Sequence, residues 1–429
     1  MLQIFPKETF VYLGFKDTDI LSVSLSMART TLLQLVFSSS SCSSLVQSST
    51  KKLPWRMNKV CFFSVCFNTT TSIPRIRIKK DPPLDAVSDK EKSIVPVLKI
   101  RDVFLHFKKE SMPFRFFTIR RRNLGIRTTE ERFEDFVRDY PTLFEIFIHP
   151  EEDLPWIKLT QEAIDLIKEE KMIHENQEQE NVVKLRKMLM ISRNQKMRAN
   201  RITMAAAFFG FPPDIVSRVV PKYPDLFELS QNGKPYETLE LLLWDENLAE
   251  TEFEKTAKAN ALESGFKDFE TRGYPLKFET RYSPGVVPKQ KAFAYLDKWQ
   301  KLPYISPYMD TEGILDHTPL ADRRMVAVLH EVLSLTLEKK ITIEILNHFR
   351  QEFNLPANLY KAVNRYPGIF YVSVKGAVHT LYLREAYERQ NLLEESHPLL
   401  SLKKKYCKLV RNGPRVRSMV ANAVRNAKC

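Results

Sequence analysis

The pattern Tyr-Pro-x-(Leu/Ile)-Phe occurs three times in this chain, at Tyr140–Phe144, Tyr223–Phe227 and Tyr366–Phe370. Proline lacks a backbone donor and disfavours helical geometry for the residue before it, so a helix has to end near each tyrosine. The same arrangement of apolar runs and breakers surrounds all three copies. A repeat of this kind predicts a set of similar modules and is more typical of a binding scaffold than of a single catalytic centre.

Three apolar runs with helical character precede each Tyr-Pro, and two extended stretches follow it. The clearest hairpin has Phe227–Leu229 and Thr238–Leu241 on either side of Asn232 and Gly233, a pair that adopts positive φ at low cost. Three helices followed by a β-hairpin is the element order of a winged helix. We therefore predict a mainly α fold with small β-hairpins, in which three winged-helix-like repeat modules are joined by an ordered connector.

The predicted helices share this order in every module. The first, second and third helices are Ile94–Phe107, Phe117–Arg122 and Thr129–Val137 in module one; Val182–Ile191, Ile202–Phe209 and Asp214–Val220 in module two; and Met325–Leu337, Ile341–Phe353 and Leu359–Val363 in module three. The tyrosine and phenylalanine of each Tyr-Pro pattern are expected to be core anchors, because a buried ring beside a helix end fixes the direction of the chain.

The repeats and the composition between them predict six segments. They are a leader at 1–74, module one at 75–176, module two at 177–250, a connector at 251–320, module three at 321–390 and a basic tail at 391–429. The connector contains Trp299, Tyr304 and Tyr308 among several prolines. So many large apolar groups indicate an ordered segment that packs against the modules.

The formal net charge of +14 suggests a polyanionic partner, but the charge is concentrated at the ends of the chain. Residues 1–80 carry +8 and residues 401–429 carry +9, so residues 81–400 sum to −3. Residues 27–80 contain no Asp or Glu and are rich in Ser and Thr, which is typical of an organelle transit peptide. Met27 is a candidate start, and a disordered basic arm is the alternative. We expect mitochondrial import, with the chloroplast as the alternative.

Signals for catalysis are weak. Three of the five cysteines lie in the leader, and Cys407 and Cys429 lie in the basic tail, which leaves no disulfide framework and no four-cysteine zinc site. The eight histidines form no recognised metal or nucleophile pattern, and no glycine-rich phosphate loop is present. No apolar run is long enough to span a bilayer. We predict a non-enzymatic protein with no metal, cofactor or small-molecule substrate.

Two clusters of basic residues are candidate nucleic-acid contacts. Residues 181–201 contain no acidic residue, and a second arginine-rich stretch lies in the equivalent region of module one, so the two together predict a groove that follows a phosphate backbone. Solvated helix faces are the alternative for either cluster alone. The candidate contacts are Arg115, Arg120, Arg121, Arg122 and Arg127 in module one, and Lys184, Lys187, Arg193, Lys196, Arg198 and Arg201 in module two.

Several segments together resemble the plant organelle RNA recognition family. The matching segments are Lys79–Asp85, Leu185–Ser192, Phe211–Asp214, Tyr223–Phe227, Leu243–Asp245, Leu302–Tyr308 and Asn364–Phe370. The resemblance covers roughly residues 75–410 and implies a plant protein that is imported into mitochondria or chloroplasts, binds organellar intron RNA and promotes splicing of group II introns. It implies other splicing factors as further partners, and no catalytic residue set.

Two other binding functions stay open. The winged-helix order also suggests an organelle DNA-binding or transcription factor, which would prefer duplex DNA to single-stranded RNA. The connector and the acidic helices suggest a protein-binding adaptor, which would have no salt-dependent affinity for nucleic acid.

Overall fold

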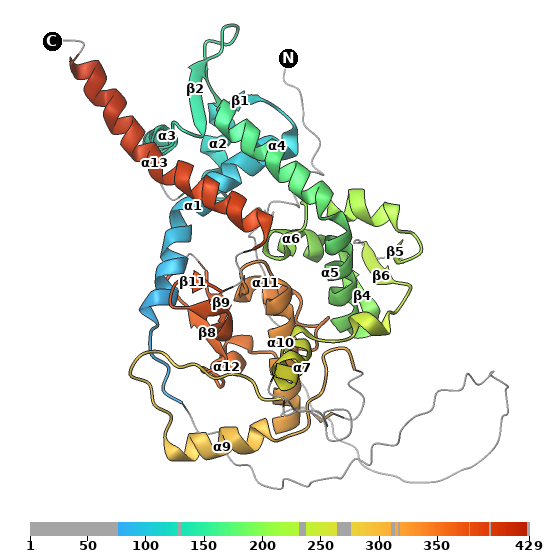
Figure 1. Ribbon diagram of the computed structural model, residues 1–429. Helices are drawn as coiled ribbons and strands as arrows, with labels where there is room; N and C mark the ends of the chain where they lie inside the picture. Colours follow the sequence, from blue (N-terminus) through green and yellow to red (C-terminus); the bar gives the residue numbers. More distant parts are fainter. Residues whose placement is uncertain are drawn as a thin grey trace, which may run out of the picture. The chain divides into compact units, whose positions relative to one another are not determined.

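The computed structural model describes residues 76–126, 130–230, 237–263, 276–309, 314–315, 318–376, 378–393 and 396–426, and Figure 1 shows their arrangement. All of these residues belong to one compact unit. The predicted leader at 1–74 lies outside the described residues, and so do the Asn232 and Gly233 turn and Arg127.

A helix, a three-residue strand, further helical elements and a β-hairpin follow one another in each of three segments. The first segment has α1 (Pro82–Phe107), β1 (Ser111–Pro113), α2 (Phe114–Arg120), α3 (Glu130–Arg138), β2 (Phe144–Ile148) and β3 (Pro155–Leu159). The second has α5 (Glu178–Ile191), β4 (Lys196–Arg198), α6 (Ala199–Phe209), η4 (Ile215–Val219), η5 (Val220–Lys222), β5 (Phe227–Ser230) and β6 (Thr238–Leu241). The third has α10 (Pro319–Leu335), β7 (Lys340–Thr342), α11 (Ile343–His348), α12 (Leu359–Val363), β8 (Phe370–Ser373) and β9 (Thr380–Leu383).

Each segment forms a three-stranded antiparallel sheet with its last strand in the middle, in the orders β1-β3-β2, β4-β6-β5 and β7-β9-β8. The rest of the described chain is mostly helical, so a mainly α fold with small antiparallel hairpins is confirmed. The strands β5 and β6 of the second hairpin lie within one residue of their predicted positions.

The three-residue strands β1, β4 and β7 were not predicted. Their central residues Met112, Met197 and Ile341 are buried and pair with Ile157, Leu239 and Leu381 of the hairpins. The apolar pattern predicts that Ile341 lies in a helix, whereas that helix begins at Ile343. A three-residue strand is too short to display the alternation that identifies strands, and its apolar residue merges with those of the next helix.

The Tyr-Pro patterns form the same turn in all three segments. The carbonyl oxygen of each tyrosine accepts a hydrogen bond from the backbone N–H of the phenylalanine four residues later, at 3.0–3.1 Å. The three phenylalanines are buried, as are Tyr140 and Tyr366, which confirms them as core anchors. Tyr223 is half-buried instead, and its hydroxyl contacts Glu178 and Gln179 of the α5 segment.

Two large apolar clusters hold the described residues together. One contains the first segment and residues of the C-terminal helix α13 (Pro398–Asn426, red in Figure 1). The other is shared by the second segment, the third segment and the connector. In the connector, Phe253 of α7 (Glu252–Glu263) stacks on Phe278 at 4.4 Å. Trp299 of α9 (Gln290–Gln300) is buried and donates a hydrogen bond to the carbonyl of Pro319.

Helix α1 contacts both the first and the third segment. Its C-terminal half places Ile100 and Phe104 in the first apolar cluster. At its N-terminal end, Asp85 accepts hydrogen bonds from the hydroxyls of Tyr371 and Ser373 at 2.8 and 2.6 Å. The Asp81 carboxylate, just before the helix, pairs with Arg384 at 2.7 Å. The helix therefore starts twelve residues before the predicted Ile94, because its first half is held by polar contacts that apolar periodicity does not reveal.

The predicted basic tail contains a long helix that completes the first apolar cluster. Leu402, Tyr406 and Val410 of α13 recur at a spacing of four residues, so they share one face, and all three are buried. The helix also packs against α4 (Gln161–Asn176), where Lys405 pairs with Glu169 at 2.6 Å. Two two-residue strands, β10 (Tyr387–Glu388) and β11 (Asn391–Leu392), lie between the third segment and α13.

Four charged residues form a compact network where α1, α13 and the third segment meet. Lys340, which is buried, lies 2.9 Å from Glu91 and 3.1 Å from Glu338. Lys403 of α13 lies 2.6 Å from Glu91 and 2.8 Å from Glu338. Burial alone would raise the pKa of Glu338, but the charges of Lys340 and Lys403 outweigh it and lower that pKa to about 2. The same two lysines hold the pKa of Glu91 below its usual value against burial.

Acidification is expected to destabilise this network. An unfolded glutamic acid has a pKa of about 4.3, so the depressed folded-state pKa stabilises the fold above that value and loses its effect as the pH falls toward 2. Glu338→Gln leaves two lysines facing one carboxylate and should cost about 2 kcal/mol near neutral pH. Thermal unfolding midpoints measured from pH 6 downward test this. Asp297→Asn, which breaks an exposed pair with Lys301, is the control and should change the midpoint little. An equal change in both variants would contradict a special role for the network.

Gly413 is expected to be required for the docking of α13. A Cβ atom added at this position would lie 2.5 Å from the carbonyl oxygen of Asp139 and 3.1 Å from the Cα of Tyr140. In a helix that contacts nothing else, Gly→Ala stabilises the helix by up to about 1 kcal/mol. The sign of the change in unfolding free energy therefore shows whether α13 packs at this position. Gly413→Ala should destabilise the protein by roughly 1–3 kcal/mol, as overpacked sites do. Chemical denaturation measures the change, with Met419→Ala on the exposed side of the same helix as the control. A stabilised Gly413→Ala variant would show that the helix does not pack there.

Candidate nucleic-acid interface

The arginine cluster of the first segment lies on α2 and the turn after it. Arg115 and Arg122 are exposed. Arg120 stacks its guanidinium over the Phe116 ring at 4.1 Å, and burial lowers its pKa. Arg121 donates a hydrogen bond to the carbonyl of Thr118 at 2.7 Å. The structure therefore presents Arg115 and Arg122 most fully to solvent, and Arg127 lies outside the described residues.

Most basic residues of the second cluster are paired with acidic residues that are distant in sequence or on the previous helical turn. Lys184 lies 2.9 Å from Glu180, and Lys196 lies 2.7 Å from Glu240 on the neighbouring strand. Arg201 pairs with Glu352 of the third segment. Arg198 is half-buried, whereas the Arg193 side chain is exposed. The stretch without acidic residues is therefore largely neutralised by the rest of the fold.

Lys187 is not on the surface. Its side chain is 5% exposed, and its ammonium lies 3.2 Å from Glu252 and 3.5 Å from Glu331. Glu331 is buried as well and accepts hydrogen bonds from the Tyr308 hydroxyl at 2.7 Å and from the backbone N–H of Glu252 at 2.9 Å. The expectation that Lys187 contacts nucleic acid is wrong, because the residue joins α5 to α10 and the connector.

The sequence predicts that the two clusters occupy equivalent positions in their modules. In the structure their positions differ. In the first segment the arginines lie on and after α2, the second helix. In the second segment they begin on α5, the first helix, and extend through β4 to the start of α6. Recurrence in the same register therefore gives no support to a shared groove.

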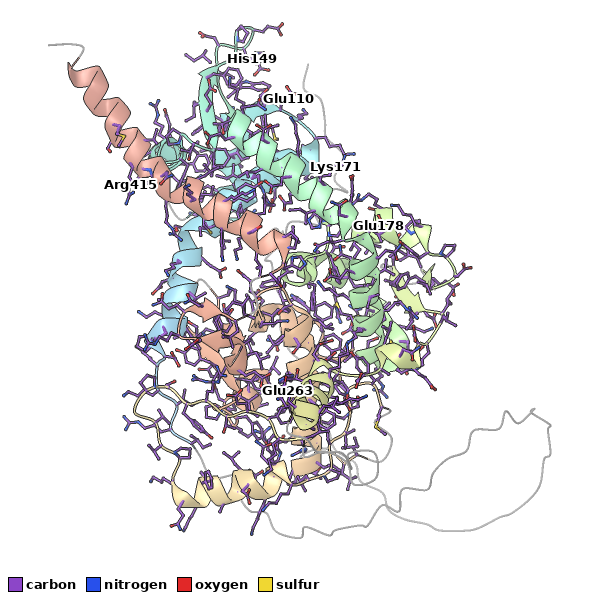
Figure 2. The ribbon with its side chains drawn as sticks, in the orientation of Figure 1. Glu110, His149, Lys171, Glu178, Glu263 and Arg415 are labelled. Atoms are coloured by element: carbon purple, nitrogen blue, oxygen red, sulfur yellow. The ribbon has the colours of Figure 1, made fainter. Side chains whose placement is uncertain are left out.

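Sequence reasoning missed a further basic surface on α13. Lys404, Lys408, Arg411 and Arg415 are exposed on this helix, and Figure 2 marks Arg415 in its C-terminal half. The signal was present, because residues 401–429 contain nine basic and no acidic residues. The charge count alone predicts a basic tail and does not show which face of a helix these basic side chains occupy.

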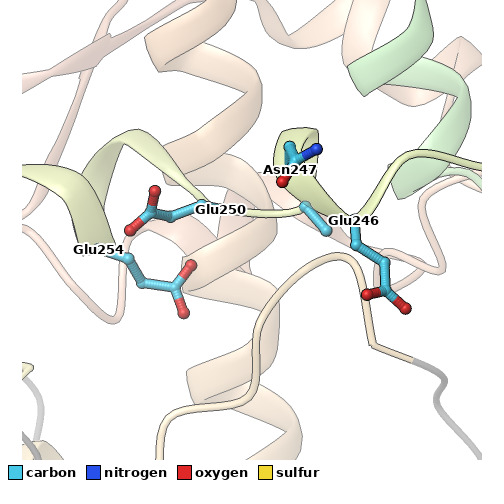
Figure 3. Close-up of a pocket in the computed structure, with 5 residues that line it drawn as sticks. Glu246, Asn247, Glu250 and Glu254 are labelled. Carbon is cyan, nitrogen blue, oxygen red and sulfur yellow. The ribbon is translucent and has the colours of Figure 1, made fainter. Parts of the chain in front are cut away.

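A hollow of about 440 Å³ between η6 (Glu246–Leu248) and α7 has the opposite charge. Glu246, Asn247, Ala249, Glu250 and Glu254 line it. Figure 3 shows that its polar groups are mainly carboxylates, and Glu254 already accepts hydrogen bonds from the backbone and hydroxyl of Thr251. Such a lining repels phosphate. Among the residues that the structure describes, no group of three His, Cys, Asp or Glu side chains is placed to hold a metal ion. No described helix is long and apolar enough to cross a membrane.

Comparisons with known proteins agree with the resemblance noted from the motifs. The family model for the plant organelle RNA recognition domain matches residues 79–415. Protein ROOT PRIMORDIUM DEFECTIVE 1 of Arabidopsis thaliana is 30% identical over 368 residues, which span 84% of this chain and 89% of that protein. Protein WHAT'S THIS FACTOR 1, chloroplastic, of Zea mays is 31% identical over 340 residues, or 78% of this chain and 67% of that protein.

A mitochondrial relative is similar over a comparable length. Protein WHAT'S THIS FACTOR 9, mitochondrial, of Arabidopsis thaliana is 26% identical over 362 residues, or 81% of this chain and 89% of that protein. No solved structure matches the chain. The family match covers all three segments, the connector and most of α13. On this match and on the identity shared with full-length relatives, the chain belongs to the plant organelle RNA recognition domain family.

Proposed function

We propose that this protein binds intron RNA inside a plant organelle and promotes splicing of group II introns without catalysing the reaction. The observation that carries the proposal is the family match over residues 79–415. Relatives named chloroplastic and mitochondrial support an organellar location. We place the protein in mitochondria, with chloroplasts as the alternative, and assign import to the leader at 1–74. Other splicing factors are its proposed protein partners.

The proposed scaffold consists of three winged-helix-like modules, at 75–176, 177–250 and 321–390, with the connector at 251–320 between the second and third. The shared element order and the shared position of the hairpin's last strand in each sheet support this division. The second and third modules share one apolar cluster, and α1 of the first module contacts the third. A rigid scaffold can hold separate stretches of one RNA at set distances, which suits an RNA that has to fold before it reacts.

RNA contacts are proposed for basic side chains that the fold leaves exposed. Arg115, Arg122 and Arg193 meet this condition among the original candidates. Such groups bind phosphates and orient the RNA, while unpaired bases supply sequence selectivity. The Glu338 carboxylate, whose pKa is strongly lowered, is engaged in a structural contact with Lys340. In this proposal the protein positions the intron, and the intron supplies the chemistry.

Helix α3 argues against duplex DNA as the ligand of the first module. In helix-turn-helix proteins, the corresponding recognition helix enters the major groove. Here that helix carries Glu134 and Asp135 on its outer side, followed by Asp139, and Arg417 of α13 pairs with Asp135 and Asp139. These carboxylates disfavour the entry of α3 into a major groove, although Arg138 and Arg417 neutralise part of their charge.

Immunoprecipitation of the tagged protein from isolated organelles is expected to enrich a small set of intron-containing transcripts. Sequencing of the bound RNA identifies them, and plants lacking the protein should accumulate the same transcripts unspliced. An immunoprecipitate from plants expressing only the tag is the control. Recovery of organelle DNA or of proteins without intron RNA would overturn the proposal.

Replacing the exposed arginines should weaken RNA binding without unfolding the chain. Arg115→Gln, Arg122→Gln and Arg193→Gln together remove three positive charges, so the slope of log affinity against log salt should become shallower by about 2 if each contacts one phosphate. Fluorescence anisotropy with a group II intron fragment measures the slope. Lys187→Gln is the matched control, because it should lower the unfolding midpoint and leave the salt slope unchanged. Equal slopes for the wild type and the triple variant would remove these arginines from the interface.

A further inference from the structure

The outer face of α13 carries a line of basic residues with regular spacing. Lys404, Lys408, Arg411 and Arg415 follow one another at intervals of four, three and four residues, and all are exposed. At about 100° per residue they fall within an arc of about 60°. The buried residues Leu402, Tyr406 and Val410 lie on the opposite side of the helix. We name the four basic residues the α13 stripe.

Acidic residues of neighbouring elements pair with basic residues of α13 that lie outside the stripe, and not with most of the stripe itself. Lys403 is taken by Glu91 and Glu338, Lys405 by Glu169, and Arg417 by Asp135. Within the described part of the chain, Lys408, Arg411 and Arg415 make no ion pair. The helix itself contains no Asp or Glu between Pro398 and Asn426 that could approach them.

An ordinary solvated helix face in the same protein looks different. In α4 the exposed charges alternate in sign and pair along the helix, as Asp165 does with Lys168 at 3.5 Å and Lys171 with Glu175 at 4.0 Å. Like charges at spacings of three and four residues repel and destabilise a helix. The α13 stripe has three such neighbouring pairs in succession. A bound polyanion would relieve this repulsion, whereas water and salt only screen it.

The geometry favours an extended phosphate backbone over a membrane surface. A helix that lies on a lipid surface inserts an apolar face between the headgroups. Leu402, Tyr406 and Val410 of α13 are already buried against α1 and the first segment, so this part of the apolar face cannot insert. Successive stripe residues are displaced by roughly 4.5–6 Å along the axis, from a rise of 1.5 Å per residue. Three or four neighbouring phosphates of one strand can therefore be contacted in sequence.

We propose that the α13 stripe is a binding site for the phosphate backbone of single-stranded RNA. This assignment rests on the proposed RNA-binding function and locates part of its contact surface. The site recognises charge and spacing and contributes no base selectivity. Because Arg417 ties the same helix to α3, RNA on the stripe lies next to the first module.

Anisotropy titrations of the full chain with labelled polyuridine RNA at several salt concentrations test the site. Lys408→Gln, Arg411→Gln and Arg415→Gln together should make the salt slope shallower by about 2, since single strands lose about 0.7 per phosphate contact. The variant Lys408→Arg, Arg411→Lys and Arg415→Lys keeps the charges and should retain the wild-type slope. Lys289→Gln, Lys291→Gln and Lys298→Gln remove equal charge from exposed positions in and beside α9 and should also leave the slope unchanged.

The outcomes separate this proposal from the function on which it rests. Wild-type binding with an unchanged slope in the stripe variant would overturn the stripe and leave RNA binding intact. Failure of the wild type to bind any RNA at low salt would overturn both. Stripe-dependent binding to anionic vesicles, without stripe-dependent RNA binding, would reassign the surface to lipid. Thermal unfolding of each variant should occur at or slightly above the wild-type midpoint, because the substituted side chains are exposed and the stripe substitutions to Gln remove like-charge repulsion.

Discussion

Helix α1 contacts the rest of the first segment, the third segment and α13. These contacts determine how the remaining elements are arranged. Its N-terminal end is fixed to the third segment through Asp81 and Asp85, and its C-terminal half belongs to the apolar cluster of the first segment. Between them, Glu91 contacts lysines of both β7 and α13. Ion pairs of this kind contribute little to net stability, because the cost of removing the charges from water offsets much of their attraction. The apolar clusters therefore supply most of the stabilisation, and the loss of one charged partner is what destabilises the network.

Much of the fold could be predicted from local signals. The Tyr-Pro turns, most C-terminal helix ends and the hairpins follow from proline geometry and apolar periodicity, and they lie close to their predicted positions. Helix α11 is an exception, because it ends at His348 instead of Phe353. The strands β1, β4 and β7 have three residues each and show no period, so they were missed. The first half of α1 was missed because its contacts, such as Asp85 with Tyr371, join residues almost three hundred positions apart.

The candidate site was harder to predict, because charge in a sequence says nothing about partners. Lys187 and Arg201 belong to a stretch without acidic residues, yet each meets a carboxylate from the third segment, Glu331 and Glu352. Conversely, the basic end of the chain was set aside as a tail, although apolar residues at every fourth position predict a helix with one buried face. The tertiary structure determines which charged side chains remain exposed. The sequence alone therefore could not separate the exposed arginines from the basic residues that pair with carboxylates.

The position of α13 has a consequence for the order in which the protein matures. The first segment is made early, but Leu402, Tyr406 and Val410, which cover its apolar cluster, come from the last helix of the described chain. Contacts across such a sequence separation form late, and the partly covered segment exposes apolar surface until then. A chain that emerges from a ribosome or a translocation pore with its N-terminus first would depend on chaperones throughout this interval. Chains that end prematurely would never bury that surface, so they would be degraded before they could compete with intact protein for a ligand.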